Sequence, residues 1–277
     1  MTVLETTRLK YEEIKPNIGA RVLNSKEELL SGELSADIRE LIERKGVLVF
    51  KQVHFTNEEQ VAFTRTLGTF MPEGEGEDVF NISLDPKLNA NKDYLKGSLF
   101  WHADGTMNPL PIGYAILSSR VLPTWGGNTE FCNTYAAYDA LDEETKAKIA
   151  KLKVMHAAWN SVFYYEPEPS QAYLEAMMRI GNIELPVVWT HKSGRKSLVL
   201  GCTAHHVVDM DWVESARLLN GLREWATSEP FHYAHEWEVG DAVMWDNTGT
   251  MHRARPYDPD CGRLLVRTKT GGEEPIV

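Results

Sequence analysis

The sequence predicts a mainly β protein, a sandwich or jelly roll of strands with a few α-helices on its flanks. Two observations support this fold class. From residue 97 onward, short β-branched and aromatic runs follow one another with glycine or proline between them. The helical segments are few and separated, whereas a parallel α/β sheet would alternate helices with strands. Doubling or closing the sheet would also protect its strand edges.

The N-terminal third contains both kinds of element. Residues 35–45 have the spacing of an amphipathic helix, with Ser35 as its expected cap. Residues 46–53 form an apolar, β-branched run and predict a buried strand. Thr56 followed by Glu59 has the spacing of a capping box. It predicts a helix that ends at Gly68.

The remaining elements follow from the same signals. Strands are expected at 97–107, 112–122, 127–133 and 263–270, in a hairpin over 184–201 that turns at 192–195, and in a hairpin over 231–247 that turns at 239–241. Helices are expected at 134–152 and 210–227. The chain has no internal repeat and no Gly/Ser linker, so we expect one domain over residues 1–277.

Composition excludes several classes of protein. Hydrophobic residues make up 43% of the chain, which is enough for a core, yet no apolar run is long enough to span a membrane. The charged N-terminus lacks the apolar stretch of a signal peptide. The net charge of −11, with no basic stripe, argues against nucleic acid as a partner. Three scattered cysteines (Cys132, Cys202 and Cys261) favour a reducing, cytoplasmic setting.

The stretch SLFWHADGTM, residues 98–107, places a histidine and a carboxylate two positions apart. Side chains at i and i+2 of a strand share a face, so His102 and Asp104 could reach one metal ion. A distant histidine would complete a face of two histidines and one carboxylate, and His252 is the candidate. The alternative is a chance pair joined by a surface hydrogen bond.

Two arginines lie near His252 in the sequence. Arg263 and Arg267 have even spacing on the last expected strand, so their side chains should share a sheet face. A guanidinium offers a planar fork to a carboxylate and stays charged at any relevant pH. The pair therefore suits recognition of carboxylates, although an ordinary solvated face would have the same spacing.

Taken together, these motifs resemble a known family. The pattern WHADGTM, WGGNTEF, MWDN and MHRARPYDP, with arginines eleven and fifteen residues after His252, is similar to the TauD/TfdA family of Fe(II)/2-oxoglutarate-dependent dioxygenases. The resemblance covers most of the chain and implies a double-stranded β-helix, or jelly roll. It implies that His102, Asp104 and His252 bind iron. Thr129 and Arg263 would bind the distal carboxylate of 2-oxoglutarate, and Arg267 the acidic group of the primary substrate.

The resemblance also implies an activity. With O2, the enzyme would hydroxylate a small, largely apolar organic acid and release succinate and CO2. Hydroxylation alone, C–O cleavage, C–S cleavage and desaturation all stay open. A binding or sensor protein that retains the metal site is the alternative outside enzymes. The expected partner is a small anionic molecule, with neither nucleic acid nor membrane, and a homo-oligomer is possible for this family.

Two long loops are candidates for lids over the site. Residues 73–97 are polar and glycine-rich, and residues 159–173 combine aromatic residues with prolines. Loops of this length usually either gate a binding site or are disordered. Phe163, Tyr164 and Tyr165 would either line an apolar pocket or pack the second loop onto the sheet.

Overall fold

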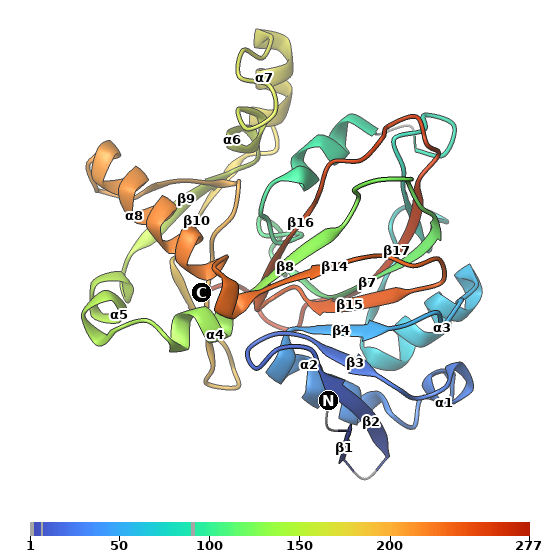
Figure 1. Cartoon of the computed structure of the whole chain (residues 1–277). Coiled ribbons are helices and arrows are strands. Elements are labelled where there is room, and N and C mark those ends of the chain that lie inside the picture. Colours follow the sequence, from blue (N-terminus) through green and yellow to red (C-terminus); the bar gives the residue numbers. More distant parts are fainter. Residues whose placement is uncertain (1–2, 7, 90–91) are drawn as a thin grey trace.

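The computed structural model describes residues 3–6, 8–89 and 92–277, and two packed β-sheets form its centre (Figure 1). The strands of the major sheet are β1 (Val3–Thr6), β2 (Leu9–Glu13), β3 (Ala20–Val22), β4 (Val47–Phe50), β5 (Phe70–Met71), β6 (Phe80–Ile82), β7 (Ile112–Val121), β15 (Ala242–Asp246) and β17 (Leu264–Gly271). Their order is β1-β2-β3-β4-β15-β7-β17-β5, with β6 also paired to β17. The minor sheet is β14 (His232–His235), β8 (Thr129–Asn133) and β16 (Thr250–Ala254), with β8 in the middle.

Apolar side chains from the two sheets meet between them. Phe131 on β8 lies against Trp245 on β15, with ring centres 5.6 Å apart. Both side chains are almost completely buried, together with Val49, Leu117 and Leu265 of the major sheet. Burial of this kind between sheet faces is what stabilises a sandwich. The mainly β prediction is therefore correct, and the space between the sheets also contains the functional site.

Three helices cover the outer face of the major sheet. They are α1 (Lys26–Leu30), α2 (Ser35–Lys45) and α3 (Asn57–Leu67). The capping box of α3 is present: the Thr56 hydroxyl accepts a hydrogen bond from the Glu59 amide, and the Glu59 carboxylate accepts one from the Thr56 amide. For α2 the expected cap is wrong, because Leu34 occupies the cap position and Ser35 lies inside the helix, where its hydroxyl donates to the Gly32 carbonyl.

A second, smaller unit lies beside the sandwich (Figure 1). Its strands are β9 (Lys153–Ala157), β10 (Asn182–Pro186) and β13 (Ala204–Val207), with the hairpin β11 (Val188–Thr190) and β12 (Lys196–Leu198). Its helices are α4 (Thr134–Asp139), α5 (Glu143–Ile149), α6 (Ala158–Val162), α7 (Gln171–Met178) and α8 (Trp212–Ala226). The short 3-10 helices η1 (Lys92–Leu99) and η2 (Glu229–Phe231) belong to the connections. Leu219 and Leu222 of α8 pack with Val154 and Val207 in this unit's core.

Three expected elements differ from the structure. The helix expected at 134–152 is two helices, because the side chains of Asn133 and Asp142 each cap a new start. The segment 231–247 is not a hairpin: β14 pairs with β8, whereas β15 pairs with β4 and β7. The segment 97–107 is not a strand, since η1 ends at Leu99 and residues 104–107 form a turn.

Among the described residues, none of the helices combines the length and the apolar character needed to cross a membrane.

Candidate metal centre and co-substrate pocket

Backbone pairing brings His102 and His252 together from distant parts of the chain. The His102 amide donates to the His252 carbonyl at 3.1 Å, and the His252 amide donates to the His102 carbonyl at 2.9 Å. Residues directly opposite each other in an antiparallel bridge present their side chains on one face. The two imidazole centres are accordingly 4.2 Å apart. Gly201 lies behind this bridge, where a Cβ would be 3.2 Å from the His102 Cα.

Asp104 joins the two histidines through a turn and not through a strand. The Asp104 amide donates to the side-chain oxygen of Asn247 at 2.9 Å, and the Asn247 side-chain nitrogen donates to the Asp104 carbonyl. The expected strand at this site is therefore wrong, while the His-x-Asp spacing still brings both side chains to one place. The Asn of the Trp-Asp-Asn motif explains why, since it holds the turn that carries the carboxylate.

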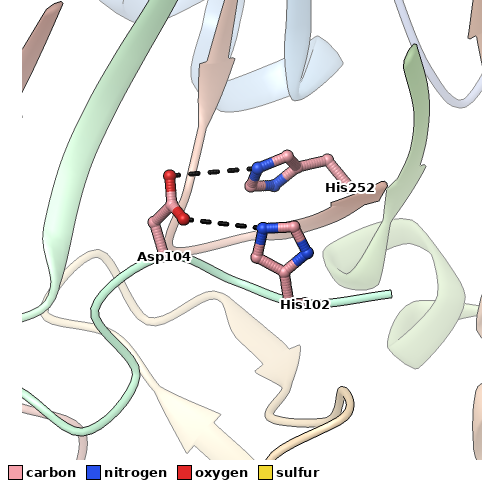
Figure 2. Close-up of side chains that lie close together, drawn as sticks. All are labelled: His102, Asp104 and His252. Atoms are coloured by element: carbon pink, nitrogen blue, oxygen red, sulfur yellow. Dashed lines mark ion pairs between the residues drawn. The ribbon is translucent and has the colours of Figure 1, made fainter. Parts of the chain in front are cut away.

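The three side chains form a compact set of metal donors (Figure 2). The Asp104 carboxylate lies 3.5 Å from His102 Nε2 and 3.9 Å from His252 Nε2. One ligand atom from each of the three residues lies within 4.8 Å of the others. The Phe100 carbonyl lies 2.8 Å from His102 Nδ1 and would accept its proton, which leaves the lone pair of Nε2 for a metal.

The charge states also fit a divalent metal. Burial and the neighbouring His102 lower the pKa of His252 to about 3, so this imidazole is neutral near pH 7. Burial alone would raise the pKa of Asp104, but the positive charge of Arg267, with a nitrogen 3.1 Å from the carboxylate, holds it well below its usual range. Neutral imidazoles and an ionised carboxylate are the donor set of the facial triad that binds non-haem Fe(II).

The three metal donors line a cavity of about 280 Å³ between the two sheets. All six residues singled out in the sequence reach it: His102, Asp104, Thr129, His252, Arg263 and Arg267. Much of the remaining wall is apolar, and includes Phe80, Ile82, Leu117, Trp245 and Leu265. A mostly apolar cavity with a few convergent polar groups is typical of a small-molecule site.

Arg263 forms one end of this cavity. Its guanidinium is almost completely buried, donates to the Gly127 carbonyl at 3.0 Å and lies 4.4 Å from the centre of the Tyr257 ring. The Gly126–Gly127 pair permits this arrangement. Both residues have positive φ, and a Cβ at Gly126 would lie 2.2 Å from the Pro256 carbonyl. The Gly-Gly-Asn motif therefore shapes the turn beside the arginine.

Thr129 begins β8 and lines the cavity together with Arg263. It is 3% exposed, and its hydroxyl accepts a hydrogen bond of 3.1 Å from the indole nitrogen of Trp237. No sequence motif marks Trp237. His235 is the partner of Thr129 in the pairing of β14 with β8, and Trp237 follows two residues later. Only this strand pairing brings Trp237 close to Thr129.

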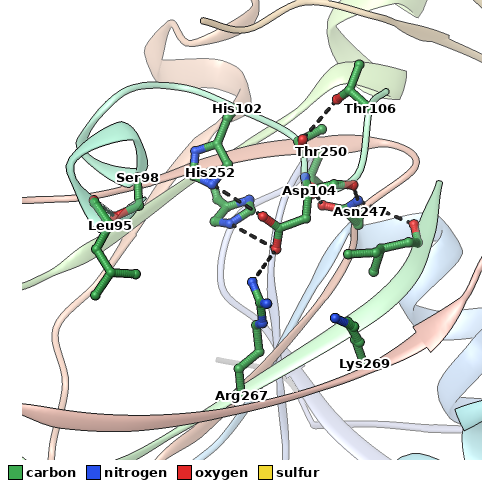
Figure 3. Close-up of polar contacts among 12 residues, drawn as sticks. Leu95, Ser98, His102, Asp104, Thr106, Asn247, Thr250, His252, Arg267 and Lys269 are labelled. Atoms are coloured by element: carbon green, nitrogen blue, oxygen red, sulfur yellow. Dashed lines mark hydrogen bonds and ion pairs between the residues drawn. The ribbon is translucent and has the colours of Figure 1, made fainter. Parts of the chain in front are cut away.

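Arg267 of β17 lies in the cavity wall together with Leu265. Arg263 also reaches the cavity, but it lies just before the strand, and the pairing of β17 with β7 is irregular between Leu264 and Leu265. Arg267 already has carboxylate partners. One nitrogen donates to Asp104 at 3.1 Å (Figure 3). Two others donate to Glu73 at 3.0 and 2.9 Å. Lys269 donates to the same Glu73 carboxylate at 2.6 Å. The sequence motifs include neither Glu73 nor Lys269. The only sequence signal for either residue is that Lys269 lies two positions after Arg267 on the same strand.

Both loops expected to be lids contribute to the cavity wall. Phe80, Ile82 and Leu95 come from the first. From the second, Tyr165 lines the cavity, whereas Phe163 and Tyr164 are 42% and 38% exposed and lie outside the wall. Met177 of α7 and Ile180 just after it also reach the cavity, and no sequence pattern marks either residue.

Two packed sheets that hold a His-Asp-His face beside a buried arginine define a class of non-haem metal enzymes with a jelly-roll fold. The model of the "Taurine catabolism dioxygenase TauD, TfdA family" matches residues 10–269. The chain belongs to this family.

Two curated relatives are similar over most of their length. The alpha-ketoglutarate-dependent 2,4-dichlorophenoxyacetate dioxygenase of Cupriavidus pinatubonensis is 36% identical over 272 residues, covering 91% of this chain and 93% of the relative. The (S)-phenoxypropionate/alpha-ketoglutarate-dioxygenase of Sphingobium herbicidovorans is 36% identical over 239 residues, covering 82% and 83%. Among solved structures, AAD-2 in complex with Mn(II) and N-oxalylglycine has a TM-score of 0.83 and 32% identity over the whole of both chains.

These similarities confirm the family and the jelly-roll fold expected from the sequence. They also confirm the class of enzyme. It is a dioxygenase, and so an oxidoreductase, that depends on a metal ion and on 2-oxoglutarate. The alternative of a protein that only binds its ligand is set aside.

Proposed function

We propose that this enzyme uses Fe(II) to hydroxylate a small aryloxyalkanoic acid, at the carbon that bears the ether oxygen. The observation that carries the proposal is the convergence of three metal donors, Thr129 and two arginines on one largely apolar cavity. The activities of the two curated relatives, on dichlorophenoxyacetate and phenoxypropionate, favour this substrate class over alkyl sulfonates.

In this proposal each polar residue has one task. His102, Asp104 and His252 would hold Fe(II) on one face and leave the opposite face to small ligands. Thr129 and Arg263 would bind the distal carboxylate of 2-oxoglutarate, which Arg263 suits because its guanidinium is buried and held in place. Arg267 would bind the carboxylate of the primary substrate, and the apolar wall would contact the aromatic ring.

The bound metal, with 2-oxoglutarate and O2, supplies the oxidising power to place one oxygen atom on the substrate and one on succinate, with loss of CO2. The protein excludes water and orients the substrate. Hydroxylation beside an ether oxygen gives a hemiacetal, and its collapse breaks the C–O bond. The products are then a phenol and an oxo acid.

A panel of acids tests this proposal. Phenoxyacetate, both enantiomers of phenoxypropionate, an alkyl sulfate and an alkyl sulfonate are each supplied with ferrous iron, 2-oxoglutarate and O2. Succinate and phenol release are measured together. We expect stoichiometric phenol and succinate from at least one aryloxy acid. Succinate release that depends on a sulfate or sulfonate alone would contradict the proposed substrate class.

We also propose that the chain is one catalytic domain that acts in the cytoplasm. Walls of the cavity come from the sandwich and from the smaller unit, which supplies Ser161, Met177, Cys202 and Thr203. The three cysteines are free, which suits a reducing compartment. Limited proteolysis that released an active fragment would argue against a single domain.

A further inference from the structure

The hydrogen bond between Trp237 and Thr129 has a fixed direction. An indole nitrogen can only donate, so the Thr129 hydroxyl oxygen must accept at this 3.1 Å contact. The hydroxyl hydrogen therefore cannot point toward Trp237. Within the described part of the chain, Thr129 makes no other side-chain hydrogen bond, and the residue lines the cavity.

This direction determines what the hydroxyl offers to a ligand. A free hydroxyl can rotate and serve as donor or acceptor, but one whose oxygen already accepts is biased to donate. The cavity wall at Thr129 therefore presents a donor beside the buried guanidinium of Arg263, which is also only a donor. A carboxylate is a ligand that only accepts, so it matches this pair of groups.

Trp237 is itself held by a buried polar chain. Its ring meets the His235 ring edge to face, with centres 4.5 Å apart and planes at 87°. His235 is buried, and its two ring nitrogens lie 3.1 Å from the Asp241 carboxylate and 2.9 Å from the Tyr233 hydroxyl. Because His235 is paired with Thr129 across the sheet, one anchored residue sets the positions of both partners of the hydrogen bond.

We propose that Trp237 is a positioning residue that fixes the Thr129 hydroxyl as a donor toward the distal carboxylate of the co-substrate. It would act through Thr129 without touching the ligand, since it lies outside the cavity wall. The inference rests on the proposed role of Thr129. Its consequence is selectivity at this end of the cavity for a ligand that ends in a carboxylate over one that ends in an amide.

The test uses Trp237→Phe, which keeps an aromatic ring and removes the N–H donor. Binding of N-oxalylglycine to the Mn(II)-loaded protein is measured by calorimetry for the wild type, Trp237→Phe, Thr129→Val and the double variant. A neutral hydrogen bond corresponds to about a 2- to 10-fold effect, so we expect Trp237→Phe to weaken binding by about that factor. Thr129→Val should weaken it more, and the double variant should match Thr129→Val alone.

Trp225→Phe is the matched control. Its indole nitrogen also donates a hydrogen bond, to the Ala137 carbonyl at 2.8 Å, but the residue lies away from the cavity. This variant should bind N-oxalylglycine as the wild type does. Mn(II) affinity should be unchanged in all variants, which separates an effect on the carboxylate end from an effect on the metal.

The outcomes separate the inference from the proposed function. If Thr129→Val weakens binding and Trp237→Phe does not, the positioning role is wrong and the role of Thr129 stands. If Thr129→Val has no effect, the proposed role of Thr129 fails. Additive losses in the double variant would also overturn the inference. Should Trp237→Phe fold poorly, the indole ¹⁵N–¹H resonance of Trp237 should shift in Thr129→Val, and an unmoved resonance would contradict the contact.

Discussion

The carboxylate of Glu73 forms a bidentate ion pair with Arg267, with N···O distances of 3.0 and 2.9 Å, just outside the cavity wall. Lys269 approaches the same carboxylate, and the guanidinium also reaches the metal-site carboxylate of Asp104. The side chains of Glu73, Lys269 and Arg267 are only 3%, 10% and 14% exposed. Arg267 is thus joined to the metal site as well as facing the substrate cavity.

The buried ion pair between Glu73 and Arg267 predicts that loss of the Glu73 charge lowers the stability of the fold. Glu73→Gln removes the negative charge that neutralises the buried cations Arg267 and Lys269. Breaking a buried ion pair lowers the free energy of unfolding by roughly 3–5 kcal/mol. Urea denaturation measures this change. Glu75→Gln, an exposed carboxylate on the same loop, is the matched control and should stay close to the wild type. Equal stability of the two variants would show that the Glu73 pair is weak.

Loss of the carboxylate donor should abolish metal binding. Asp104→Ala removes one of three ligands and the only anionic one, so Mn(II) should be lost on dialysis, together with turnover after iron is restored. Metal content by mass spectrometry is the readout. Asp139→Ala, on the exposed end of α4, should retain metal. A metal content in Asp104→Ala equal to the wild type would mean that the ion binds elsewhere.

Arg263→Ala should raise the requirement for 2-oxoglutarate. Removing one partner of a buried charge pair corresponds to roughly 2–5 kcal/mol, which is about a 30-fold or larger rise in the half-saturating concentration. The KM for the primary substrate should change much less. Arg255→Ala, an exposed arginine nearby, is the control. The assignment fails if N-oxalylglycine binds Arg263→Ala as tightly as the wild type.

Arg267→Leu should separate substrate binding from co-substrate use. The variant should lose coupled turnover of the acid and keep slow succinate release without product. Since Arg267 also pairs with Asp104, Mn(II) affinity is measured in parallel, so that an effect on the metal is distinguished from an effect on the substrate. An amide of the substrate should be poor with the wild type and no worse than the acid with Arg267→Leu. If the amide is as good a substrate as the acid for the wild type, Arg267 does not bind the substrate anion.

The buried carboxylate of Asp241 predicts a pH effect on stability. Burial would raise its pKa, but hydrogen bonds from His235 and Lys51 lower it below the usual 3.8. A lowered pKa stabilises the fold above the pKa of the unfolded chain, and this contribution is lost as the pH falls through the folded value. Below about pH 4 the advantage of the wild type over Asp241→Asn should shrink as the pH falls. An advantage that grew as the pH fell below about 4 would contradict this sign.

The residues of the candidate site were more predictable from the sequence than the elements that hold them. His102, Asp104 and Arg263 belong to spacings that metal and carboxylate chemistry restrict. The turn that carries Asp104 depends on Asn247, a contact across 143 positions that no local pattern encodes. Likewise, β14 and β15 have the local pattern of a hairpin, but their pairing is decided by which sheet buries their apolar faces. Trp237 and Glu73 act only through tertiary contacts, so periodicity gave no sign of them.

The backbone bridge between His102 and His252 also concerns how the protein is assembled. The two ligands lie 150 positions apart, so they meet only after the chain has closed the topology that surrounds them. Of the three donors, a partly folded chain keeps only His102 and Asp104 close together, and two donors hold an ion more weakly than three. Metal therefore binds the completed fold in preference to its precursors and stabilises it by mass action, by about 2.7 kcal/mol at a hundredfold excess over the dissociation constant. The ion that serves the chemistry would thus also lengthen the lifetime of the folded enzyme in the cell.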